Sequence, residues 1–109
     1  MAVEESKHIN TRLAKIVAEL LQQLAQSYVT NRVKLSYYTV QRYARKEGLN
    51  LHPTSVAMRV KILVTEAARR AGVKIEFARG HRAGIYIHKS DIPRLVTALE
   101  GVVQGQLSK

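Results

Sequence analysis

The sequence predicts a mainly helical domain with a small β-hairpin, which places it in the α+β class. Apolar residues recur at helical spacing along most of the chain, and they alternate with polar residues just after Gly72. A chain of 109 residues, 46% of them hydrophobic, can bury one modest core but not two. We therefore expect a single domain over residues 1–109, with its core in about 10–104 and flexible ends at 1–7 and 105–109.

The first predicted helix runs from about Asn10 to Tyr28, and either Asn10 or Thr11 can cap its first turn. Its broad apolar face consists of Ile9, Leu13, Ile16, Val17, Leu20, Leu21, Leu24 and Tyr28. This face can close the core of the domain. Part of it, around Leu20, Leu21 and Leu24, can also pack on a second copy of the chain, and the two roles are compatible.

The segment that follows, 29–35, is predicted to connect this helix to the next one. Asn31 favours a turn. Val33 and Leu35 alternate with Arg32 and Lys34, so the segment can form a short strand that joins the hairpin, with the two cations on its solvent side.

Two further helices are predicted in the middle of the chain. One begins at Ser36, whose hydroxyl can cap the first turn, and ends at Gly48, which adopts positive φ at little cost. The other follows Pro53 and runs from Thr54 to the residue before Gly72. Its inner stripe comprises Val56, Val60, Leu63, Val64, Ala67 and Ala71, and its outer side comprises Ser55, Met58, Arg59, Ile62, Thr65, Glu66, Arg69 and Arg70.

Two alternating runs after Gly72 predict an antiparallel hairpin. Apolar and polar residues alternate first over 73–77, where Val73, Ile75 and Phe77 are the apolar members, and again over 85–88, where Ile85 and Ile87 are. The connecting segment 79–84 is rich in glycine and cations, so we expect a flexible, basic tip.

In this order of helix, turn, helix and hairpin, the segment from about Leu35 to Lys89 resembles the winged helix-turn-helix family. The small, basic, cysteine-free chain is similar to small archaeal DNA-binding proteins of chromatin or transcription type. The resemblance implies that helix 54–71 is a recognition helix for the major groove. It also implies that the hairpin is a wing whose tip, 79–84, touches the DNA backbone or the minor groove.

The charge distribution points to a polyanionic partner. The net charge of +10 arises entirely within 32–89, where thirteen lysines and arginines oppose three glutamates; the charges outside this segment cancel. The absence of cysteine excludes disulfides, thiolate metal sites and cysteine nucleophiles. No apolar run has the length of a signal peptide or a membrane span, so we expect a cytoplasmic protein that does not bind membranes. Together with the positive charge, this predicts a nucleoid-associated protein that binds double-stranded DNA.

The candidate DNA-binding residues are cations and the outer side chains of helix 54–71. They are Arg42, Arg45, Lys46, Thr54, Ser55, Met58, Arg59, Lys61, Ile62, Arg69, Arg79, His81 and Arg82. In the first two turns of that helix only Arg59 can form a bidentate contact with guanine, and no Asn or Gln is available for adenine. Met58 and Ile62 can touch thymine methyl groups. We therefore expect weak sequence specificity, typical of a chromatin-associated protein or of a transcriptional regulator that also uses DNA shape.

A last helix is predicted after Ser90 and Asp91, which can cap it, with Pro93 in its first turn, and it continues to Gly105. Its apolar stripe comprises Ile92, Leu95, Val96, Leu99, Val102 and Val103. A core already occupied by three helices and a sheet leaves little room for this stripe. We therefore expect a homodimer through this helix, the first helix or both, with Leu95, Leu99, Val102 and Val103 at the interface.

Two other classes of function are weighed against DNA binding. Small basic winged domains also occur among ribosomal proteins that bind structured RNA, but both ends of this chain are nearly neutral and exposed aromatics for base stacking are few. A module that docks an acidic protein is a further alternative. The four histidines are scattered, no pair of acids has catalytic spacing and no phosphate-binding glycine loop is present, so we expect no enzyme activity, metal, cofactor or small-molecule ligand.

Overall fold

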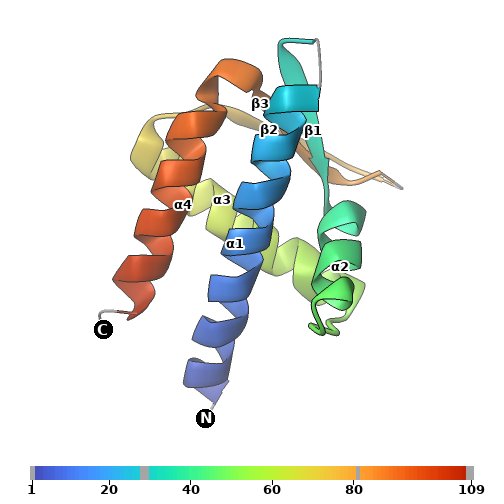
Figure 1. Cartoon of the computed structure of the whole chain (residues 1–109), viewed down its shortest axis with the longest axis vertical. Helices are drawn as coiled ribbons and strands as arrows, with labels where there is room; N and C mark the ends of the chain where they lie inside the picture. Colours follow the sequence, from blue (N-terminus) through green and yellow to red (C-terminus); the bar gives the residue numbers. More distant parts are fainter. Residues whose placement is uncertain (1, 28–29, 81, 108–109) are drawn as a thin grey trace.

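The computed structural model describes the backbone of residues 2–27, 30–80 and 82–107, and the side chains of 8–26, 30–80 and 82–102. The chain is mainly helical with one small antiparallel sheet, which confirms the α+β class (Figure 1). In chain order the elements are α1 (Ala2–Ser27), β1 (Arg32–Ser36), α2 (Tyr37–Lys46), α3 (Pro53–Ala71), β2 (Ile75–Ala78), β3 (Gly84–His88), a single 3₁₀ turn (Lys89–Asp91) and α4 (Ile92–Leu107).

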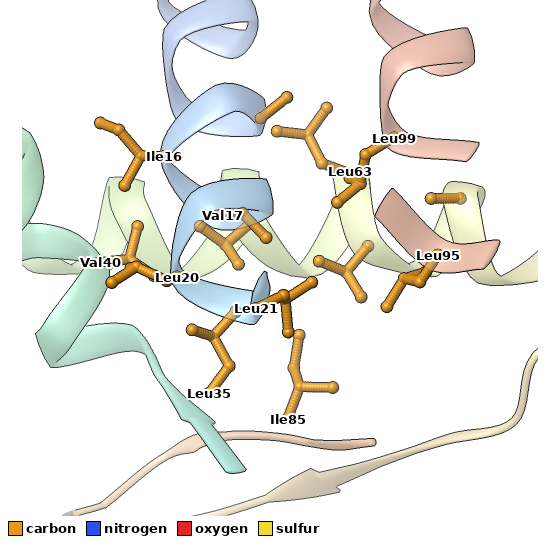
Figure 2. Packing of buried hydrophobic residues seen from close by; sticks show 14 of the residues in the cluster. Ile16, Val17, Leu20, Leu21, Leu35, Val40, Leu63, Ile85, Leu95 and Leu99 are labelled. Atoms are coloured by element: carbon orange, nitrogen blue, oxygen red, sulfur yellow. The ribbon is translucent and has the colours of Figure 1, made fainter. Parts of the chain in front are cut away.

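The core lies where α1 and α4, which run side by side, both cross α3 (Figure 1). Figure 2 shows side chains from these three helices pointing toward one another, with the sheet closing one side of the cluster. The members labelled there are Ile16, Val17, Leu20, Leu21, Leu35, Val40, Leu63, Ile85, Leu95 and Leu99. All ten are buried, so burial of their apolar surface supplies the main driving force for this arrangement.

Both helices in the middle of the chain end as predicted, at glycines in the left-handed conformation. Gly48 has φ 82° and Gly72 has φ 67°. After each glycine the chain turns back, because the N–H of Leu49 donates to the carbonyl of Ala44 (2.8 Å) and that of Val73 donates to the carbonyl of Ala68 (2.9 Å). These are Schellman motifs, in which the glycine tolerates positive φ and the next residue is buried against the helix.

The predicted third strand is confirmed. β1 pairs with β3 from Arg32↔His88 to Ser36↔Gly84, and β2 pairs with β3 on the other side, which gives the order β1-β3-β2. Val33 on β1 and Ile87 on β3 face the core, as the alternation predicts. Phe77 does not: it is 42% exposed although its register partner Ile85 is fully buried. Both β1 and β2 are edge strands, but α1 and α2 cover the inner side of β1 and bury Val33 and Leu35, whereas no helix covers β2 to the same extent.

Several boundaries differ from the predictions. α1 begins at Ala2 rather than at Asn10, and the segment expected to be flexible is helical. α4 continues past Gly105 to Leu107. The Ser36 hydroxyl makes no capping bond to α2. Tyr28 lies outside the described residues.

Three of the four residues assigned to a dimer surface on α4 lie in the core of the single chain, and the homodimer itself stays a prediction. Leu95, Leu99 and Val102 are buried against α1 and α3. Of the other candidates for pairing, Leu20 and Leu21 are buried as well, whereas Leu24 is only partly buried. The side chain of Val103 lies outside the described residues. The described residues of the apolar stripe of α4 therefore pack against α1 and α3 of the same chain. Across the described part of the chain, no helix combines the length and the apolar character that crossing a membrane requires.

Candidate nucleic-acid interface

The side of α3 that faces away from the core is uncovered along its length. Residues at successive turns form a solvent-facing stripe, which we call the α3 outer face: Thr54, Met58, Ile62, Thr65 and Arg69. Met58 is 57% exposed and Ile62 is 62% exposed. The first turn is fixed by Pro53 at the first helical position and by His52, whose Nδ1 accepts from the N–H of Thr54 at 3.2 Å. The α3 outer face is thus held on a rigid element.

Arg59 occupies a different place from the one expected. Its side chain is half-buried on the flank of α3 toward α1, where Nη1 donates to Asn10 Oδ1 at 2.9 Å. Its Nε donates to Ser55 Oγ at 3.2 Å. The helical pattern puts Arg59 and Ser55 on the polar side of α3, but α1 lies close enough there for its Asn10 to accept a hydrogen bond from Arg59. The guanidinium therefore links two helices in this structure, and a bidentate contact with guanine would require these bonds to be exchanged.

The opposite flank of α3 meets the hairpin. The ammonium group of Lys61 lies 5.0 Å from the centroid of the Phe77 ring, within the range of a cation–π interaction. Both side chains are exposed, so this contact holds a cation at the border between α3 and β2. Phe77 is a candidate interface residue that the alternation pattern misses, since strict alternation assigns it to the core.

The C-terminal half of α3 carries its charges as a small network. Arg69 Nη2 lies 2.5 Å from Glu66 Oε2, and Arg70 Nε lies 3.5 Å from the same oxygen. The hydrogen bond from Arg69 lowers the pKa of Glu66, and the same contact raises the pKa of Arg69. Glu66 therefore stays ionised and offsets part of the positive charge next to the α3 outer face.

Three further candidate cations lie on α2. The guanidinium of Arg42 is 5.8 Å from the Tyr38 ring centroid, and the ammonium of Lys46 is 5.5 Å from that of Tyr43. Arg42, Arg45 and Lys46 are all exposed. Tyr38 is 64% exposed, whereas burial raises the pKa of the neighbouring Tyr37, which packs on the core. Exposed cations with aromatic supports suit contacts to phosphate.

The hairpin tip is hydrogen-bonded to the start of α2. The N–H of Tyr37 donates to the carbonyl of Ala83 at 3.2 Å, and Gly84 brings the two backbones so close that a Cβ atom built there would lie 2.3 Å from the carbonyl oxygen of Leu35. Arg82 lines an open cleft of about 590 Å³ there, together with residues of α1, β1 and α2. Arg79 and Arg82 are exposed, and His81 lies outside the described residues.

On the solvent face of the sheet, charged side chains contact other side chains of the same face. Arg32 on β1 reaches across the central strand to Glu76 on β2, with 2.5 Å between Nη2 and Oε1. Between them its guanidinium lies 4.1 Å from the centroid of the Tyr86 ring on β3. Lys34 is half-buried, with its ammonium 5.6 Å from the same ring. This face therefore has less positive charge to offer than α2, α3 and the hairpin tip.

Within the described residues, no three histidine or acidic side chains approach closely enough to hold a metal ion. Comparison of the chain with protein-family models, with curated proteins and with solved structures finds no match.

Proposed function

We propose that this chain is a winged helix-turn-helix protein that binds double-stranded DNA with weak sequence specificity. In this proposal α3 lies in the major groove with its outer face toward the bases. The β2–β3 hairpin acts as the wing, and the cations of α2 and of the wing tip contact the phosphate backbone. The protein would serve as a chromatin-associated factor or a transcriptional regulator.

One observation carries the proposal: α3 has an uncovered face, and exposed cations lie on α3 itself, on α2 and on the hairpin. Lys61 and Arg69 belong to α3, a group of three cations to α2, and Arg79 and Arg82 to the hairpin. The whole excess of positive charge falls in the segment that builds these elements. A rigid helix with an uncovered face and flanking cations suits a duplex, whose phosphates run along both sides of the groove.

The same surface explains why weak specificity is expected. Direct readout depends mainly on Arg, Asn and Gln side chains that form paired hydrogen bonds with base edges. Arg59 is engaged by Asn10 and Ser55, and Arg69 by Glu66. The affinity would therefore come mostly from phosphate contacts, which are independent of sequence.

The test is a titration of the purified protein against several unrelated duplexes and a structured RNA across a salt series. We expect all duplexes to bind with similar affinity, the RNA to bind less well, and affinity to fall steeply as salt rises. Each phosphate contact contributes about 0.9 to the slope of log affinity against log salt concentration. The double variant Lys61→Ala/Arg82→Ala should therefore lower this slope by about 2.

Lys15→Ala is the matched control, because it removes the charge of an exposed lysine on α1, away from the proposed surface. Its slope should equal that of the parent. Equal slopes for the parent and the double variant would remove the α3 and wing surface from consideration. Tighter binding of the RNA than of any duplex would replace DNA with structured RNA as the partner.

A further inference from the structure

We propose that Met58 and Ile62 read the 5-methyl groups of thymines in the major groove, so that the protein prefers thymine-containing sites by apolar contact. This inference depends on the proposed function, because it assigns specificity to the same helix. It concerns a different kind of interaction, which makes no use of hydrogen bonds to base edges.

The first support is the placement of the two side chains. Among the described side chains, the large hydrophobic ones that stay exposed are Tyr38, Met58, Ile62 and Phe77, and only Met58 and Ile62 belong to the α3 outer face. They are one turn apart, about 6 Å along the helix axis. Successive base pairs are separated by about 3.4 Å. The two side chains can therefore reach base pairs about two steps apart.

The second support is the chemistry of the groove. Thymine presents a methyl group in the major groove, whereas the other three bases present only hydrogen-bond donors and acceptors there. An apolar side chain gains by covering a methyl group, and it costs free energy when it covers a polar group that then loses water. Met58 and Ile62 would thus favour thymine and disfavour guanine or cytosine at the positions they cover.

The third support is the charge around the pair, which argues against a second copy of the chain as the occupant. A symmetric contact centred on Met58 and Ile62 would bring the exposed Lys61, which lies beside this pair, close to its own counterpart in the second copy. Like charges brought together in this way oppose association. The phosphates of a duplex have the complementary charge, so duplex DNA is the occupant that both the apolar pair and its cationic border favour.

The test compares one thymine-rich duplex with the same duplex in which every thymine is replaced by deoxyuridine, which removes only the methyl groups. Covering one methyl is worth about fourfold in affinity, so we expect the parent to prefer the thymine duplex about 16-fold when both side chains contribute additively. In the double variant Met58→Ala/Ile62→Ala this ratio should fall to about one. Because parent and variant are titrated against the same two duplexes, differences in the stiffness of the DNA cancel.

Lys15→Ala is again the control, since Lys15 is exposed on α1 and away from the proposed surface; it should keep the preference for thymine. Equal affinity of the parent for both duplexes, with a steep dependence on salt, would overturn this inference and leave DNA binding in place. Failure to bind either duplex at low salt would overturn both proposals. Sedimentation of the parent as a dimer and of the double variant as a monomer would identify a second copy as the occupant and refute the inference.

Discussion

Replacing Gly84 by alanine should destabilise the protein at the point where the hairpin joins β1. Gly84 is the first residue of β3 and pairs with Ser36, the last residue of β1. A Cβ atom there would lie 2.3 Å from the carbonyl oxygen of Leu35 and 3.0 Å from the Cα atom of Ser36. Both obstacles belong to the backbone, so no side-chain rotation relieves the clash.

The expected magnitude follows from these distances. Carbon–oxygen contacts between strands are normally about 3.3 Å or longer, so β1 and β3 must separate by about 1 Å at this point. Overpacking of this kind costs about 1–3 kcal/mol. The separation also stretches the hydrogen bond from Tyr37 to Ala83, which is 3.2 Å long in the structure and whose loss costs about 1 kcal/mol. The free energy of unfolding should therefore fall by about 2–4 kcal/mol.

Urea denaturation followed by far-ultraviolet circular dichroism measures this change, and Gly101→Ala supplies a control with the opposite sign. Gly101 lies inside α4, and apart from its chain neighbours and the nearby backbone of α4 itself, no atom of the described residues lies within 4 Å of the position that its Cβ atom would take. Alanine there should raise the free energy of unfolding by about 0.5–1 kcal/mol, since glycine is a poor helix former. Unfolding of Gly84→Ala at the urea concentration of the parent would refute the close approach of β1 and β3.

Two further predictions concern the core and the charge network. Leu99→Ala should lower the free energy of unfolding by about 2–5 kcal/mol. This decrease should be the same at low and at high protein concentration. Glu100→Ala, at the neighbouring exposed position, is the control and should change the free energy of unfolding by less than about 0.5 kcal/mol. A decrease in the free energy of unfolding that depends on protein concentration would indicate that Leu99 packs against a second copy of the chain. Glu66→Gln should tighten duplex binding by releasing Arg69 and Arg70, and unchanged binding would exclude both arginines from the interface. Because the pKa of Glu66 is lowered in the folded state, its small stabilising effect is present above the ordinary carboxyl pKa and is lost as pH falls through the lowered value. The difference in stability between parent and variant should therefore vanish in acid.

Local signals in the sequence predict the elements well where they depend on the residues themselves. Gly48 and Gly72 mark the ends of α2 and α3 because positive φ is a property of the backbone at that residue. The alternation of Val33 and Leu35 predicts β1, and the register with β3 confirms it. The α3 outer face is predictable for the same reason, since the inner stripe of a helix defines its opposite side.

The errors arise where a residue's environment depends on which element crosses it. Arg59 belongs to the polar side of α3, but only the position of Asn10 on α1 shows that it is captured. Leu99 has the same periodicity whether a second chain or the crossing of α1 and α3 buries it. Phe77 continues the alternation of β2, but no helix covers this strand to the extent that α1 and α2 cover β1. The periodicity of apolar residues predicts the direction of a side chain, but it does not predict which element packs against that side chain.

The exposure of Met58 also determines how this protein responds to oxidants. The chain has no cysteine, and its two methionines are Met1 and Met58. Oxidation of Met58 to the sulfoxide would place a polar oxygen on the α3 outer face. The packed interior would be unaffected, because this side chain lies outside the buried cluster. Peroxide treatment should thus change the face of α3 while leaving the thermal unfolding temperature almost unaltered, and methionine sulfoxide reductase would reverse the change.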